Sequence, residues 1–248
     1  MTRLCTICAR GGSKGVPNKN LRLVGGSPLI VHSIRHAIEC QMFDTVAVSS
    51  DSAEILELAR REGVNLCIER PPHLATDTAS KLDAIQHAVQ ASETATGMSF
   101  DILADLCPTA PLRLISDIIA CVAAVETSGA QNIFSVTPAH RSPYFNLVEV
   151  GADGRVLLSK TPANDLVRRQ DSPACYDMNA SIYVWRRAPF IDKPYLFAEN
   201  TAIHVMPRER SFDIDTPLDL EIVEMLMATA VRSTGCLVPS EFMSPVKL

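Results

Sequence analysis

Apolar residues along the chain follow two alternating spacings. Short runs rich in β-branched residues predict buried strands, and longer stretches with apolar residues at helical spacing predict amphipathic helices. The expected strands are residues 4–9, 44–49, 64–68, 100–106, 133–137 and 203–205, and the expected helices are residues 28–40, 53–62, 79–91, 115–126 and 217–231. Such repeated βα units build a parallel sheet with helices on both faces. We therefore predict a three-layer α/β fold around a mostly parallel sheet.

The alternation breaks between about residues 138 and 195. Residues 144–150, a turn at residues 153–155 and residues 181–185 indicate antiparallel strands in this segment. It also carries more apolar residues than so small an appendage can bury, namely Tyr144, Phe145, Leu147, Val148 and Val150. We expect one domain over residues 1–248, with residues 138–195 as a small mixed subdomain that pairs two subunits in a homodimer.

The composition excludes several classes of protein. The 248 residues carry a net charge of -5, the opposite of the basic surface that nucleic-acid binding needs. Hydrophobic residues make up 47% of the chain, which is too many for intrinsic disorder. The longest unbroken apolar run, residues 118–125, is far shorter than the ~20 residues of a membrane span. Near the N-terminus, Arg10 and two glycines interrupt the chain before the apolar stretch of a signal peptide could form. We therefore expect a cytoplasmic protein with no membrane partner.

The eight cysteines are scattered along the chain. Cys5 and Cys8 form a C-x-x-C motif, but it lies in a predicted strand, where residues three apart point to opposite faces. No second pair or histidine cluster completes a tetrahedral metal site. We therefore predict buried structural thiols.

A glycine-rich basic loop, residues 10–20, directly follows the first predicted strand. It holds three glycines together with Arg10, Lys14 and Lys19. Glycines let backbone N–H groups converge on an anion, and the cations neutralise it. The loop matches neither of the common dinucleotide and P-loop motifs, and its alternative interpretation is a flexible basic loop. Its place at the carboxyl end of a parallel strand favours a phosphate site.

Two carboxylates, Asp213 and Asp215, lie two residues apart in an extended segment and would share one of its faces. Such a pair suits Mg²⁺, which takes one or two carboxylates plus substrate phosphates. The alternative is that they are ordinary partners of a helix N-terminus. Two proline-stiffened loops, residues 70–78 and 107–113, also follow predicted strands. They either position polar groups at the site or simply connect neighbouring elements.

Five stretches in order carry a family resemblance. Residues 10–21 resemble the motif A-R-x-x-S-K-G-x-P-x-K-N, and residues 70–80 resemble R-P-x-x-L-A-x-D-T-A-S. Residues 108–113 resemble P-T-S-P-L-R, residues 179–183 resemble N-G-A-I-Y, and residues 212–219 resemble F-D-I-D-x-x-x-D. Together they resemble the acylneuraminate cytidylyltransferases, the CMP-sialic acid synthetases, over about residues 5–220.

The resemblance implies a nucleotide-diphospho-sugar-transferase-like fold, a homodimer, and Mg²⁺-dependent transfer of CMP from CTP to a nine-carbon keto-sugar acid. Pyrophosphate would be released. By similarity, the catalytic residues are Arg10, Lys19 and Asp213; the nucleotide contacts are Arg10, Gly12, Ser13, Lys14, Lys19, Asn20, Arg70, Asp77, Ser80 and Lys81; the sugar contacts are Cys107, Thr109, Arg113, Arg169, Asn179 and Tyr183; and the metal ligands are Asp213 and Asp215.

The departures from the family motifs fall mainly in the presumed sugar pocket. Cys107 replaces a usual glutamine, Asp177 reverses the charge of a common arginine, Ser181 replaces an alanine, and Lys81 replaces a serine at the nucleotide. An acceptor such as legionaminate, rather than neuraminate itself, becomes plausible. The alternatives are CMP activation of pseudaminate or KDO, and, in a different class, a catalytically silent CTP-binding regulatory protein. The retained metal pair speaks against a silent protein.

Overall fold

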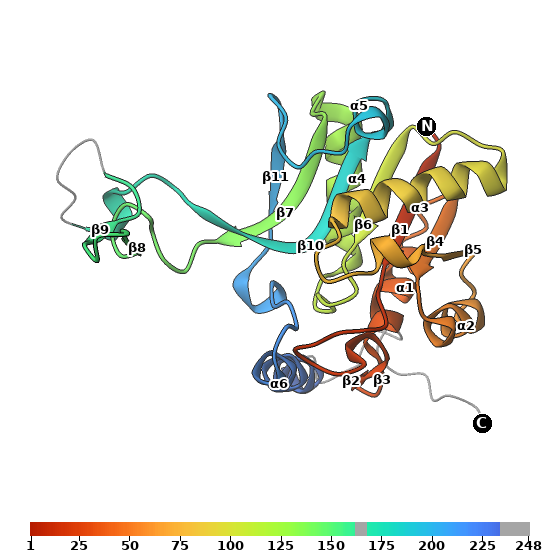
Figure 1. The fold of residues 1–248 in the computed structure, drawn as a ribbon, viewed down its shortest axis with the longest axis horizontal. Helices are drawn as coiled ribbons and strands as arrows, with labels where there is room; N and C mark the ends of the chain where they lie inside the picture. Colours follow the sequence, from red (N-terminus) through yellow and green to blue (C-terminus); the bar gives the residue numbers. More distant parts are fainter. Residues whose placement is uncertain (162–167, 234–248) are drawn as a thin grey trace.

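The computed structural model describes residues 1–161 and 168–233, and in these residues seven strands form one central sheet. The strands are β1 (Arg3–Cys8), β4 (Thr45–Ser50), β5 (Leu66–Glu69), β6 (Ile102–Leu106), β7 (Asn132–Pro138), β10 (Tyr176–Arg186) and β11 (Ala202–Val205). Their order across the sheet is β11-β7-β10-β6-β1-β4-β5. β10 runs antiparallel to β6 and β7, and the other neighbours run parallel. The predicted mostly parallel sheet is confirmed (Figure 1).

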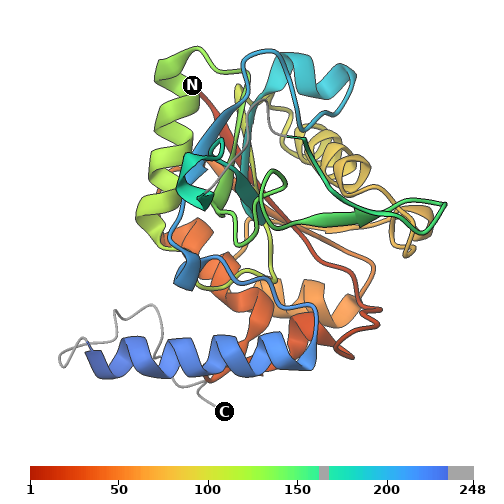
Figure 2. The same cartoon turned by 90° about the vertical axis from the view of Figure 1, so that its left-hand side faces the viewer.

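Helices cover both faces of this sheet, as predicted. One face packs against α1 (Leu29–Glu39), α2 (Ala53–Arg61) and α4 (Ile115–Ser128). The other face packs against α3 (Lys81–Thr96) and α5 (Arg187–Asp192). Figure 2 shows α3 and α4 on opposite sides of the strands. Burial of apolar side chains in both layers stabilises the fold at ~25 cal/mol per Å² removed from water.

A smaller third cluster joins the C-terminal helix α6 (Pro217–Ser233) to the hairpin of β2 (Leu23–Val24) and β3 (Ser27–Pro28). Its buried members are Val16, Val24, Leu29, Ile214, Val223 and Met227. The cluster packs the glycine-rich loop and the segment before α6 into one unit, although about 200 residues of sequence separate them.

The predicted elements are present with shifted ends. α3 continues to Thr96, five residues beyond its expected end, and stops at Gly97, whose φ of 67° is the left-handed conformation that glycine adopts at low cost. Ser52 and Ser80 cap α2 and α3 by accepting hydrogen bonds from the backbone N–H groups of Ile55 and Asp83. The remaining described helices are single 3₁₀ turns at Lys19–Leu21, Pro72–Leu74, Arg169–Asp171 and Arg208–Arg210.

Residues 138–195 divide into two parts. β10 and α5 belong to the main body, while β8 (Val148–Val150) and β9 (Val156–Leu158) form an antiparallel hairpin on an arm that projects from the sheet (Figure 1). Of the strand expected over residues 144–150, only the last three residues form a strand, which is β8. The preceding residues turn instead, because the N–H groups of Phe145, Asn146 and Leu147 all bond to the carbonyl of Ser142.

The seven cysteines in the described residues are all free thiols. Cys5, Cys40 and Cys121 are buried in the core, as predicted, whereas Cys8, Cys67, Cys107 and Cys175 are only half-buried. Cys236 lies outside the described residues. Over the part of the chain that the structure describes, no helix is both long and apolar enough to cross a membrane.

Candidate active site

A cavity of about 380 Å³ opens at the carboxyl ends of β1 and β6. Twelve of the predicted site residues line it: Arg10, Ser13, Lys14, Lys19, Asn20, Arg70, Asp77, Ser80, Lys81, Cys107, Thr109 and Asp215. They come from the glycine-rich loop, the two proline-stiffened loops and the segment before α6. Parallel strands end at the same edge of a sheet, so loops that are far apart in sequence meet there.

The glycine-rich loop supplies cations to one wall. Arg10 and Lys14 both pair with the carboxylate of Asp77, at 2.6 Å for Arg10. Hydrogen bonds from Lys14 and Arg10 hold the pKa of Asp77 below its ordinary value. Asn20 is buried and donates from Nδ2 to the carbonyl of Arg10, which fixes the course of the loop. Gly12, a predicted nucleotide contact, is exposed and does not line the cavity.

Lys19 ties this loop to the carboxylate segment, which we define as residues 206–215. Its ammonium donates to the carbonyl of Ile214 at 2.6 Å and to Oδ1 of Asp215 at 2.9 Å. Gly15 lies so close to this segment that a Cβ atom there would overlap the carbonyl oxygen of Asp215. Glycine is therefore required at this position for close approach of two backbones.

The two predicted metal ligands differ in exposure. Asp215 faces the cavity with a side chain that is 73% exposed, whereas Asp213 is largely buried and bonded to the Thr109 hydroxyl. Burial, together with the nearby charge of Asp215, raises the pKa of Asp213. Its Oδ1 atom is buried and has no hydrogen-bond partner among the described residues. An unpaired carboxylate oxygen beside a second carboxylate is a donor set that suits a hard cation. The described residues hold no cluster of three or more potential metal ligands, so a divalent ion there would need substrate oxygens as well.

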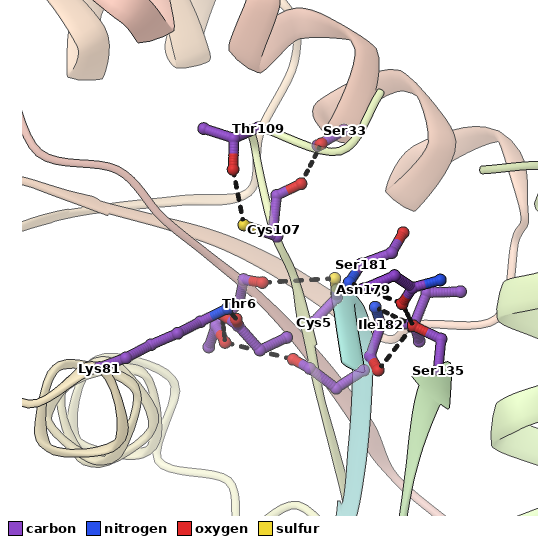
Figure 3. A network of polar contacts seen from close by, with 12 residues as sticks. Cys5, Thr6, Ser33, Lys81, Cys107, Thr109, Ser135, Asn179, Ser181 and Ile182 are labelled. Carbon is purple, nitrogen blue, oxygen red and sulfur yellow. Dashed lines mark hydrogen bonds and ion pairs between the residues drawn. The ribbon is translucent and has the colours of Figure 1, made fainter. Parts of the chain in front are cut away.

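The floor of the cavity is a buried polar network beneath Lys81 (Figure 3). The Lys81 ammonium lies 3.4 Å from Oδ2 of Asp105 and 4.4 Å from the centre of the Tyr183 ring. Asp105 is fully buried and also accepts a hydrogen bond of 2.9 Å from Thr6. Burial lowers the pKa of Lys81, but Cys107, Asp105 and Tyr183 outweigh that effect, so the pKa is raised and the group stays charged. Tyr183, a predicted sugar contact, thus supports the floor.

Arg113 and Asn179, also predicted sugar contacts, lie behind the cavity. Arg113 is fully buried and donates to the Ser181 hydroxyl at 2.9 Å, the Ser33 hydroxyl at 2.8 Å and the carbonyl of Cys107. Burial lowers its pKa to about 10. Arg113 therefore holds the residue after β6, Cys107, in place through its carbonyl. Asn179 is buried as well.

Arg169 lies far from these residues, on the arm. Its guanidinium donates to the carbonyl of Ala139 at 2.6 Å and lines a second cavity of about 560 Å³ with His140 and Arg208. Within the single chain, the structure therefore does not bring Arg169 to the first cavity.

Within the single chain, two of the four motif departures do not line the first cavity. The hydroxyl of Ser181 is bonded to Arg113 in the core, and the carboxylate of Asp177 accepts a hydrogen bond from the backbone N–H of His140 at the base of the arm. Cys107 and Lys81 do face the cavity.

Sequence reasoning missed Cys8, which lines the cavity although it was expected to be a structural thiol. Its position as the last residue of β1 was the available signal. Apolar lining from Leu74, Ala79 and Ala84 was also missed, because small apolar residues on a loop and a helix carry no chemical signature.

Comparisons with known proteins agree with this geometry. A family model described as Cytidylyltransferase matches residues 4–238. "Post-translational flagellin modification protein B" of Campylobacter coli is 42% identical over 90% of this chain and 94% of its own length. "CMP-N,N'-diacetyllegionaminic acid synthase" of Campylobacter jejuni is 40% identical over 91% of this chain and 94% of its own.

Among solved structures, a CMP:2-keto-3-deoxy-manno-octonic acid synthetase in complex with CTP superposes with a TM-score of 0.66 at 20% identity. The match covers 93% of this chain and all of that one, and it supports the fold. The extent of the family match and the identity to the curated relatives together show that this chain belongs to the cytidylyltransferase family.

Proposed function

We propose that this cytidylyltransferase transfers CMP from CTP to the anomeric hydroxyl of a nonulosonic acid, with release of pyrophosphate. The observation that carries the proposal is the cavity in which the cations of the glycine-rich loop face the carboxylate of Asp215, two residues after the largely buried Asp213. We further propose an acceptor of the N,N'-diacetyllegionaminate type. The name of the 40% identical relative supports this choice, as does Cys107 at the cavity wall, where the family usually has a glutamine.

The triphosphate would bind against the glycine-rich loop. Arg10, Lys14 and Lys19 provide three positive charges within one wall, and phosphoryl transfer depends mostly on positioning and charge stabilisation. Arg70 is buried in the same wall, where its guanidinium donates to the carbonyl of Ser49 at 2.8 Å. This contact fixes the guanidinium before substrate arrives, which lowers the entropic cost of binding.

Asp213 and Asp215 would hold the Mg²⁺. The unpaired Oδ1 of Asp213 and the exposed carboxylate of Asp215 fit such an ion. When bound, the ion would neutralise phosphate charge and lower the pKa of the attacking hydroxyl. Lys19 contacts Asp215 directly and would keep that carboxylate oriented toward the cavity.

The acceptor would occupy the side of the cavity formed by Lys81, Cys107 and Thr109. Thr109 connects the two halves of the site, because its hydroxyl bonds to Asp213 and lies 3.0 Å from the sulfur of Cys107. A sugar hydroxyl beside Thr109 would therefore lie next to the carboxylate pair. The Lys81 ammonium has three donors, and those not directed at Asp105 can reach an acceptor oxygen.

We also propose that the arm pairs two subunits into a homodimer. The hairpin exposes Val148, Val150, Val156 and Leu157, with exposed fractions of 56 to 70%. An apolar patch of this kind on a small projecting element marks an interaction site.

A pyrophosphate-release assay tests the proposed reaction. The chain would be incubated with CTP and Mg²⁺ and, in separate reactions, N,N'-diacetyllegionaminate, pseudaminate, neuraminate or KDO. We expect the highest kcat/KM with the first acceptor. Highest kcat/KM with another acceptor would overturn the assignment of the sugar. CTP binding without turnover on any acceptor would instead favour the regulatory CTP-binding alternative.

A further inference from the structure

The carboxylate segment is anchored to the main body by a buried ion pair. Arg210 pairs with Oδ2 of Asp117, the third residue of α4, and the two side chains are only 25% and 6% exposed. Nε2 of His204 on β11 lies 3.2 Å from the other oxygen of the same carboxylate. Asp117 also accepts a hydrogen bond of 2.9 Å from the backbone N–H of Leu114 at the start of α4. One carboxylate therefore joins a helix start, an edge strand and the carboxylate segment.

The same anchor organises the opposite wall of the cavity. The loop that presents Cys107 and Thr109 runs directly into the start of α4, which Asp117 fixes. The carbonyl of Thr109 accepts a hydrogen bond of 2.9 Å from the N–H of Ile214, between the two predicted metal ligands. The Ile214 hydrogen bond and the Arg210 ion pair thus hold the carboxylate pair in place relative to Thr109, together with the contacts that Lys19 makes to Ile214 and Asp215.

A second anchor supports this assignment. The buried amide of Asn179 donates to the hydroxyl of Ser211, the residue after Arg210, at 2.9 Å, and accepts from the Ser135 hydroxyl at 2.6 Å. Buried hydrogen bonds of this kind fix a chain in one arrangement, because breaking them leaves unpaired polar groups. The segment before Asp213 is consequently held at two successive residues of its turn at residues 208–211.

We propose that Arg210 is a positioning residue for the reaction, which acts through Asp117 to set the place of Asp213 and Asp215 opposite Thr109. Its catalytic consequence rests on the proposed function. Arg210 does not line the first cavity, and its guanidinium is paired with Asp117. Displacement of reacting groups by about 1 Å can cost about 10²-fold in rate, so loss of the anchor should act far more strongly on turnover than on folding.

Arg210→Gln removes the charge while leaving Asp117 free to cap α4. The matched control is Arg187→Gln: Arg187 makes a bidentate pair with Glu93 at 2.6 and 2.8 Å, with similar exposures of 31% and 16%, but it joins α5 to α3 away from the carboxylate segment. Both variants should lower the melting temperature by similar amounts. Arg210→Gln alone should reduce kcat by about 10²-fold and raise the Mg²⁺ concentration for half-maximal rate.

Hydrogen exchange of the Ile214 amide provides a readout that does not depend on activity. We expect its exchange to be about tenfold faster in Arg210→Gln than in the wild type, and unchanged in Arg187→Gln. Arg210→Lys, which keeps the charge, should recover part of the protection and of kcat, and it becomes the test variant if Arg210→Gln does not fold. Unchanged protection of Ile214, or a loss of kcat no larger than that of the Arg187 control, would overturn the proposal. A wild type that is inactive on every acceptor would refute the proposed function. The exchange rate of the Ile214 amide would then still test whether Arg210 anchors the carboxylate segment.

Discussion

Among the single residues, Asp213 is under opposite demands from catalysis and from the stability of the fold. Its buried, unpaired Oδ1 disfavours the folded carboxylate, and burial raises its pKa. Asp213→Asn should therefore leave the melting temperature unchanged or higher, while turnover falls by about 10²-fold or more because a hard anionic ligand is lost. Thermal unfolding and pyrophosphate release at saturating Mg²⁺ measure the two effects. Near-normal rates would mean that the carboxylate is only a structural partner near the start of α6.

Gly15 offers a test of the close approach between the glycine-rich loop and Asp215. Gly15→Ala should depress kcat with every acceptor, since the new methyl group would push the Asp215 backbone away from Lys19. We expect a loss of about 10-fold to 10²-fold. Gly12→Ala is the control, because its Cβ would meet no atom within 4 Å. Equal activities of the two variants would contradict this geometry.

The residue at position 107 should determine the preference among acceptor sugars without affecting the binding of CTP. Cys107→Gln adds an amide donor and acceptor to the acceptor side of the cavity, so the ratio of kcat/KM for neuraminate to that for N,N'-diacetyllegionaminate should rise by about tenfold or more. The KM for CTP should not change. Cys107→Ser, which changes the sulfur without adding volume, is the comparison. A sugar ratio that moves only together with the KM for CTP would refute the assignment.

The sequence was enough to predict that residues of the glycine-rich loop line the site. It was not enough to predict which residues lie behind the cavity. Arg10 and Lys19 could be placed because their loop follows a strand at the ligand-binding edge of a parallel sheet. Arg113 could not, because a motif does not reveal whether its arginine faces a ligand or donates to Ser33 and Ser181 in the core. Residue type fixes which bonds are available, and only packing decides which are made.

At the scale of elements, helix α1 carries a pH-sensitive group in the core. His36 is 2% exposed, and burial, together with the charge of Arg113, lowers its pKa to about 3. The unfolded histidine has a pKa of about 6.5. Between these values the unfolded chain binds a proton that the native chain does not, so the free energy of unfolding falls as the pH falls, by about 1.4 kcal/mol per unit at full slope.

His36→Leu should remove this contribution. Urea unfolding at a fixed protein concentration should show that the wild type loses about 2 kcal/mol more than the variant between pH 7.5 and pH 5. Parallel pH profiles for the two proteins would contradict a neutral, buried His36.

Elements of the sheet were predictable because each strand and helix carries its own periodicity. The exception is β10, whose antiparallel direction was expected but whose place between β6 and β7 was not. Strand order depends on contacts between distant segments, such as Tyr183 opposite Asp105 and Phe134. Periodicity along one segment contains no information about its neighbours.

For the whole molecule, the exposed hairpin of the arm leads us to predict that two copies of the chain form a dimer. If the exposed hairpin pairs two copies, sedimentation at micromolar concentration should give a species near twice 27.0 kDa. Val150→Lys with Leu157→Lys should shift that species toward the monomer, because both side chains are at least 64% exposed and each charge would be buried on pairing. A single 27 kDa species for the wild type would exclude this role for the arm.

In the proposed reaction, the acceptor hydroxyl attacks the α-phosphate of CTP in the cavity lined by the glycine-rich loop and Asp215. The most direct test of this reaction uses N,N'-diacetyllegionaminate carrying ¹⁸O at the anomeric hydroxyl, with CTP and Mg²⁺, and mass spectrometry of both products. We expect one pyrophosphate without label for each CMP-sugar, with the ¹⁸O retained in the bridge between sugar and phosphorus, and product formation slower by about 10²-fold or more with Asp213→Asn. Label in pyrophosphate, or pyrophosphate released without a CMP-sugar, would contradict it.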